Sequence, residues 1–174
     1  MGGTLRGSAY HRFLELVDHS AYPEKDVPGW IRRSVEDMKA SGRLLTEYAA
    51  LIGIKAMEAF MAHDESRRIR EAAADGKLWR EQPFFMAVPA KELDDSFPDD
   101  ENVIIQGVID AFWQEDSELV LLDYKTDRVT EAEELKKRYS VQLDLYSRAL
   151  SQIKGLKVKE KLIYSFALDR FIYL

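Results

Sequence analysis

The sequence contains no cysteine, and this absence excludes several classes of site. Structural disulfides, thiolate zinc centres, iron–sulfur clusters and cysteine nucleophiles all need the thiol group. The sequence also lacks any run of about 18 apolar residues, so we expect no membrane-spanning helix. A metal bound by this chain would therefore have to be held by carboxylate, imidazole or carbonyl groups.

An excess of positive charge is missing as well, since the formal net charge is -6. Bulk charge therefore gives no indication of nucleic-acid binding. Carboxylates that serve a metal site also lower the net charge, so any contact with DNA has to come from local basic clusters. The candidates are Arg32–Arg33, Arg67–Arg70 and Lys136–Arg138. Taken singly, such a cluster is more often a solvated helix face, and this interpretation stays open.

The length of 174 residues fits a single domain made of two parts. Residues 1–76 have helical periodicity, whereas residues 77–174 predict an α/β core. The start at Met1-Gly2-Gly3 and the end after Phe171–Leu174 are abrupt, and we expect a domain excised from a larger protein. The expected helices are 8–18 with Ser8 as N-cap, 29–41, 44–62, 64–74 and 131–152, with Gly76 and Gly155 as stops; the expected strands are 79–88, 103–113, 118–125, 159–168 and 171–174; residues 91–101 are an expected acidic loop.

The order strand, strand, helix, strand after residue 100 predicts a mixed sheet with a crossover helix. Side chains alternate along a strand, so Asp123 and Lys125 point to the same face. Asp110 lies on the preceding strand, and a short hairpin would bring its carboxylate near that of Asp123. Apolar neighbours indicate that these strands are buried, where two adjacent carboxylates repel each other and resist ionisation.

A divalent cation would relieve this repulsion, and oxygen ligands without sulfur favour Mg²⁺, with Mn²⁺ as a substitute. Such an ion polarises a phosphoryl oxygen and lowers the pKa of bound water. The ammonium of Lys125 would then orient the water or stabilise negative charge. A role as base would require its pKa to fall far below about 10.4, so we favour the electrostatic role. A charged strand edge with a simple Asp–Lys ion pair is an equally good interpretation of these residues alone.

The motifs around these residues resemble the RecB-type branch of the PD-(D/E)xK nucleases. Gly107–Asp110, a short hairpin and Leu121–Asp127 carry the main similarity. Arg6–His11 is similar to the N-terminal segment of the family, and Arg80–Phe84 to its Glu-x-Pro-Phe strand. Tyr139–Tyr146 is similar to the helix motif that follows the catalytic strand. The similarity extends over almost the whole chain and is greatest to the C-terminal nuclease domain of AddA-type bacterial helicase–nuclease subunits.

The resemblance implies a restriction-endonuclease-like α/β fold, in which helices flank a mixed β-sheet and a helical region precedes it. It implies a metal held by His11, Asp110, Asp123 and the carbonyl of Tyr124. Lys125 would be the catalytic lysine, with the two aspartates beside it in the reaction centre.

Three further residues are expected near this site. Gln142 and Tyr146 are four apart and share a helix face. We expect Gln142 to contact the site or the DNA backbone, although packing of the helix on the sheet is an equally good interpretation. Glu81 is either a further acidic group near the site or a structural hydrogen-bond acceptor. His19 and His63 are expected to be surface residues.

The activity implied by the resemblance is Mg²⁺-dependent hydrolysis of DNA, by an exonuclease acting on single strands that a helicase delivers during recombinational repair of double-strand breaks. The resemblance also implies ATP-dependent helicase domains in the same full-length chain, a bacterial cytoplasmic location and a second, AddB-like subunit. One departure from the family pattern, Ser8 in place of threonine, keeps the hydroxyl group. Two alternatives stay open, namely a DNA-end-binding or subunit-docking module with little cleavage, and a structural sheet domain without a site.

Overall fold

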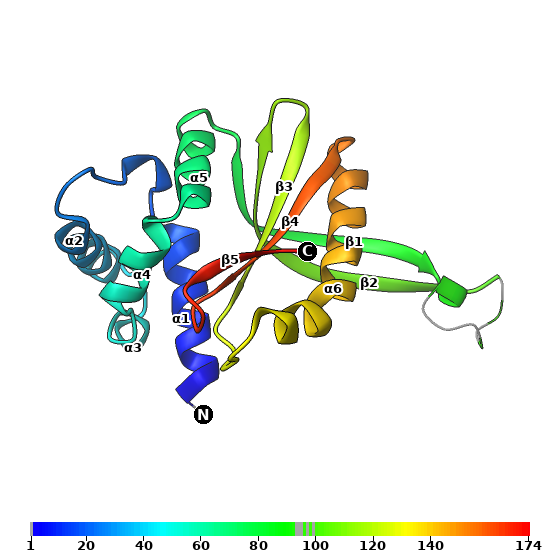
Figure 1. Ribbon diagram of the computed structural model, residues 1–174, viewed down its shortest axis with the longest axis horizontal. Coiled ribbons are helices and arrows are strands. Elements are labelled where there is room, and N and C mark those ends of the chain that lie inside the picture. The colour runs from blue at the N-terminus through cyan, green and yellow to red at the C-terminus, as the bar shows by residue number, and fades with distance from the viewer. Residues whose placement is uncertain (1, 93–95, 97, 99) are drawn as a thin grey trace.

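Five strands form one mixed sheet with helices on both of its faces in the computed structural model of the protein (Figure 1). The structure describes residues 2–92, 96, 98 and 100–174. Within this part of the chain, none of the helices has the length and apolar character needed to cross a bilayer. The helices are α1 (Gly2–Leu16), α2 (Val27–Ala40), α3 (Thr46–Ala49), α4 (Ile54–Met61), α5 (Asp64–Ala74) and α6 (Ala132–Lys154), with 3₁₀ turns η1 (His19–Ala21) and η2 (Ala90–Glu92); the strands are β1 (Leu78–Pro89), β2 (Asn102–Glu115), β3 (Glu118–Lys125), β4 (Lys157–Ser165) and β5 (Arg170–Tyr173).

The strands are arranged in the order β1-β2-β3-β4-β5. β3 and β4 run parallel and are joined by α6, whereas the other neighbouring pairs are antiparallel. The crossover helix ends at Gly155, whose φ of 66° is a left-handed conformation that glycine adopts readily. The predicted α/β fold, its β2–β3 hairpin and its N-terminal helical region are therefore confirmed.

Several local expectations are wrong. α1 already begins at Gly2, so Ser8 lies inside the helix and does not cap it. The expected helix 44–62 is two helices, because the chain is extended at Gly53, where a Cβ would lie 2.5 Å from the Tyr10 hydroxyl. His19 is buried rather than on the surface, and its Nε2 donates a 2.7 Å hydrogen bond to a helix carbonyl. Of the expected loop 91–101, residues 93–95, 97 and 99 lie outside the described residues.

The sheet separates two apolar cores. Val120 and Leu122 of β3 pack toward the helical half of the chain, and Leu121 packs on the opposite face against α6. Every residue in the range Leu119–Tyr124 is buried as a result, because helices cover both faces of this strand. Asp123 is therefore drawn into the interior together with its apolar neighbours, and only 4% of it is exposed.

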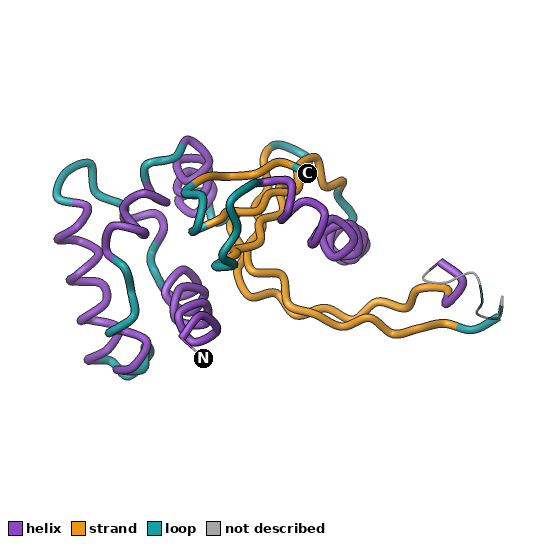
Figure 2. Tube along the Cα trace, turned by 60° about the horizontal axis from the view of Figure 1, so that its bottom comes forward, coloured by secondary structure: helices purple, strands orange, loops and turns teal. Residues whose placement is uncertain are grey.

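β1 and β2 bend together where Glu81 faces Asp110. Ile109 packs on the α6 face whereas Ala111 packs on the opposite face, so the usual alternation shifts at Asp110 although the β1–β2 register is the same on both sides. Glu81 has a φ of 49°, a left-handed conformation that costs a non-glycine residue about 1–2 kcal/mol. Beyond the bend, the hairpin projects from the rest of the molecule as a long arm (Figures 1 and 2). The bend thus places two carboxylates at the junction of the arm with the sheet.

Candidate active site

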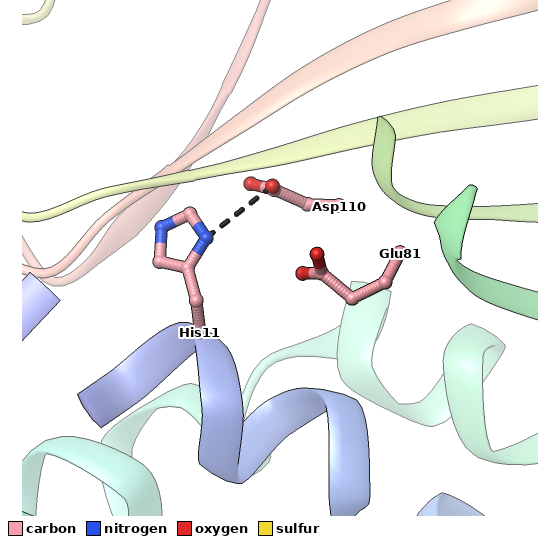
Figure 3. Close-up of side chains that lie close together, drawn as sticks. All are labelled: His11, Glu81 and Asp110. Carbon is pink, nitrogen blue, oxygen red and sulfur yellow. Dashed lines mark ion pairs between the residues drawn. The ribbon is translucent and has the colours of Figure 1, made fainter. Parts of the chain in front are cut away.

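The side chains of His11, Glu81 and Asp110 converge from α1, β1 and β2 (Figure 3). Nδ1 of His11 lies 3.3 Å from Oδ1 of Asp110, and its Nε2 donates a 3.0 Å hydrogen bond to the carbonyl of Tyr124. Oδ2 of Asp110 accepts a 2.7 Å hydrogen bond from the amide of Tyr124. The backbone pairing of β2 with β3 runs from the hairpin turn to Ala111 and Leu122, so Asp110 lies one residue beyond the last pair. Asp110 therefore extends the link between these strands and also ties them to α1.

This cluster has the donor atoms of a site for a divalent cation. One ligand atom from each of His11, Glu81 and Asp110 can be chosen so that all lie within 4.8 Å of one another. Two carboxylates and an imidazole suit Mg²⁺ or Mn²⁺, and the Tyr124 carbonyl offers a further oxygen beside His11. The residues present therefore fit the metal that the family resemblance implies.

The protonation of the cluster indicates a shortage of positive charge. Burial, followed by the charges of Asp110 and Glu15, raises the pKa of Glu81 to about 7. Burial by itself would lower the pKa of His11, but the hydrogen bond and charge of Asp110 outweigh burial and raise it. A cation bound by these groups would offset the negative charge that raises both pKa values and would compete with protons for the ligand atoms.

Asp123 and Lys125 form an ion pair at the end of β3. Nζ of Lys125 lies 2.7 Å from Oδ2 of Asp123, and the two side chains are 14% and 5% exposed. Burial and the charge of Asp110 raise the pKa of Asp123 to about 6, although Lys125 opposes this shift. Burial would lower the pKa of Lys125, but Asp123 outweighs burial and raises it. The lysine is therefore held as an ammonium cation at neutral pH.

One face of α6 surrounds this ammonium. Oε1 of Gln142 accepts a hydrogen bond of 3.4 Å from Lys125, and Nε2 of Gln142 donates one of 3.2 Å to the Tyr146 hydroxyl. The ring of Tyr139 lies beneath the ammonium, 4.0 Å from Nζ to the ring centroid, and its hydroxyl donates to Asp127. The sequence placed Tyr139 in the family-like motif Tyr139–Tyr146 but predicted no role for this residue at the site. Its spacing of three from Gln142 was the signal that could have placed it at the site.

The structure brings most of the expected site residues together, with one difference. Asp123 contacts Lys125 and does not belong to the cluster of three, in which Glu81 takes a place instead. His63 is half-buried and pairs with Asp169, away from the site. Members of each basic cluster are ion-paired with carboxylates: Arg33 with Asp26, Arg67 with Asp64 and Glu71, Arg68 with Glu115 and Glu160, Lys136 with Glu133, and Arg138 with Asp127.

Comparison with known proteins gives a consistent result. The family model described as the PD-(D/E)XK nuclease superfamily matches residues 3–171. An ATP-dependent helicase/nuclease subunit of the AddA type from Lachnoclostridium phytofermentans is 33% identical over 205 residues, which cover 98% of this chain and 15% of the relative. A protein of the same name from Clostridium botulinum (strain Langeland) is 37% identical over 172 residues, which cover 96% of this chain and 13% of the relative. The chain thus spans 13–15% of the length of these curated relatives.

Proposed function

Because this chain belongs to the PD-(D/E)XK nuclease superfamily, we propose that it hydrolyses DNA phosphodiesters with Mg²⁺, as an exonuclease on single strands. The observation that carries the proposal is the buried Lys125–Asp123 pair beside the cluster of His11, Glu81 and Asp110. A plain strand-edge ion pair would not account for a second group of convergent ligand atoms next to it. A purely structural sheet domain would need neither the ion pair nor the cluster of ligand atoms.

His11, Asp110 and Glu81 would hold the metal, with Asp123 and the Tyr124 carbonyl completing the site. A divalent cation supplies positive charge that polarises a phosphoryl oxygen and makes a bound water more acidic. Asp110 also positions Tyr124 through its backbone amide. Contacts of its two ring nitrogens with Asp110 and the Tyr124 carbonyl fix the orientation of the His11 imidazole in the cluster.

Lys125 would act as a fixed positive charge rather than as a base, because Asp123 raises its pKa. An ammonium placed there stabilises the charge that develops on the phosphate in the transition state. Gln142 and Tyr139 hold the flexible lysine side chain in place from α6. Tyr146 orients the amide of Gln142, so these α6 residues support the reaction centre through Lys125.

The proposal includes a larger setting. Residues 1–174 would form one nuclease domain within a longer chain that also carries ATP-dependent helicase domains. The relatives are named ATP-dependent helicase/nuclease subunits, which supports such domains and a second, AddB-like subunit. In this setting the protein would act in the bacterial cytoplasm, in double-strand break repair by recombination, on strands that the helicase unwinds.

Cleavage assays with three proteins test the proposal: the wild type, Asp123→Asn, and Asp37→Asn as a control at an exposed position of α2. With linear single-stranded DNA and Mg²⁺, we expect the rate to fall by about 100-fold or more in Asp123→Asn only. An exonuclease should leave circular single strands intact. Equal cleavage by the wild type and Asp123→Asn would reject the assignment of the site.

The alternative function, a DNA-end-binding or docking module, predicts a different pattern. DNA would bind in Ca²⁺, but no turnover would follow in Mg²⁺ or Mn²⁺. The ion pair of Lys125 with Asp123 is compatible with such a module, because an ammonium engaged by a carboxylate needs no catalytic role. Turnover by the wild type that requires Lys125, measured with Lys125→Met, would exclude this alternative.

A further inference from the structure

An open pocket of about 510 Å³ adjoins the cluster of metal-type ligands. Its volume lies within the range of pockets that bind small organic groups, about 300–1,000 Å³. His11 and Glu81 belong both to the pocket wall and to the cluster, so an occupant of the pocket would lie directly beside the point of hydrolysis. The lining includes His11, Arg12 and Glu15 of α1, Tyr48 of α3, Glu81 of β1 and Thr126, which follows β3.

The charges of the pocket wall do not suit a phosphate group. Glu15 contributes a carboxylate to the wall, and Glu81 belongs to the ligand cluster. Arg12 is the only arginine or lysine among the described residues that line the pocket, and it is already engaged. Its guanidinium lies 2.6 Å from Glu15 and also donates to the carbonyl of Arg43. Among the described lining residues outside the ligand cluster, no unpaired arginine or lysine is therefore offered to a second phosphate, whereas an uncharged part of a nucleotide does not need one.

Tyr48 brings an aromatic side chain to the lining of this pocket. It lies on α3, a helix that packs against α1, and its side chain is partly buried against the apolar core of the helical half. The ring is thus held by the protein while it also lines the pocket. An aromatic side chain so placed stacks on nucleobases of any sequence, because every base has a π face.

We infer that this pocket binds one unpaired nucleobase of the DNA strand, stacked on Tyr48, next to the phosphate that is cleaved. The inference rests on the proposed nuclease function and names the feature that selects single strands. An interior base of a duplex is paired and stacked on both faces, so it must leave the duplex before it can stack on Tyr48. The stacked base also sets which phosphate reaches the cluster of His11, Glu81 and Asp110.

An abasic-site scan measures this contact. Single-stranded oligonucleotides that lack one base, at a position moved stepwise along the strand, are titrated with the protein in Ca²⁺ so that binding is measured without cleavage. We expect one position at which loss of the base weakens wild-type binding by about fivefold or more. Tyr48→Leu should bind the intact strand more weakly by a similar factor and should lose the sensitivity at that position. Tyr48→Phe keeps the ring and should behave as the wild type.

Tyr173→Leu is the matched control, since Tyr173 is a tyrosine of β5 that is 48% exposed. It should keep both the affinity and the pattern of the wild type. A wild-type scan without a sensitive position overturns the inference, as does a Tyr48→Leu protein that keeps the sensitivity, or a wild type that does not bind single strands. A normal scan in a protein that never cleaves in Mg²⁺ rejects the proposed nuclease activity but leaves the base pocket supported.

Discussion

Replacing Asp123 with asparagine should remove a pH-dependent destabilisation of the metal-free protein. The side chain keeps its size and its carbonyl oxygen but loses its charge. Burial beside Asp110 raises the pKa of Asp123 to about 6, whereas an unfolded chain has a value of about 3.9. Each unit of this difference corresponds to about 1.36 kcal/mol, so ionised Asp123 costs the folded state about 3 kcal/mol.

The sign follows from the direction of the shift. A carboxyl group with a raised pKa in the folded state stabilises the protein at low pH, and this stabilisation is lost as the pH rises through 6. Between pH 8 and pH 5, the wild type should therefore gain roughly 1–2 kcal/mol relative to Asp123→Asn. Burial lowers the pKa of His19 to about 4, so His19 destabilises both proteins below pH 6.5 and cancels in the difference.

Urea unfolding monitored by tryptophan fluorescence, with a chelator present, gives the free energy of unfolding of both proteins at the two pH values. Asp37→Asn, at an exposed position, should show the pH dependence of the wild type. The change in the free energy of unfolding between pH 8 and pH 5 is compared for the two proteins. If it differs by less than roughly 0.5 kcal/mol, Asp123 is not a desolvated carboxylate in the folded protein. The interpretation of the site as short of positive charge would then be wrong.

Three further predictions concern the surroundings of the site. Tyr139→Leu should lower the cleavage rate by about 5–10-fold with little change in KM, because the ring under Lys125 is lost. Tyr139→Phe keeps the ring and should keep most of the activity. Steady-state kinetics of the two variants separates these outcomes. Arg68→Met should lower the free energy of unfolding by about 1–2 kcal/mol in urea titrations, since its two glutamate partners lose a shared, half-buried guanidinium; an unchanged value would mean that the network contributes nothing. Gly107→Ala should reduce both stability and activity, because a Cβ would lie 2.9 Å from the ring of Phe84; unfolding and cleavage assays that match the wild type would contradict this steric limit.

The core of the fold was accessible from the sequence because its signals are local. β3 was predicted with the bounds that it has, since a run of apolar residues between polar turns is typical of a strand covered on both faces. The same periodicity brought Asp123 and Lys125 to one face, where they form their ion pair. Helix ends marked by glycine, such as Gly155, were predicted for the same reason, because the backbone conformation depends on that residue itself.

Tertiary structure decided which acidic and basic side chains of the site contact one another. Glu81 joins His11 and Asp110 because β1 and β2 bend together at this point, and a left-handed glutamate has no signature in the sequence. His11 comes from a helix remote in the chain, and only the packing of α1 on the sheet brings it to Asp110. Tyr139 likewise contacts Lys125 only because α6 crosses over the sheet.

Asp110, Asp123 and Lys125 were predicted as a group from the sequence by itself, because motif and strand alternation act over a few neighbouring positions, and their role at the site stays a prediction. The side chains that contact these three residues could not be predicted in this way. Whether Asp123 faces a metal ligand or the ammonium depends on side chains from α1, β1 and α6, and these meet only after long-range packing has buried both faces of the sheet. The sequence determined which functional groups the chain carries, and the packing decided which of these groups lie in contact.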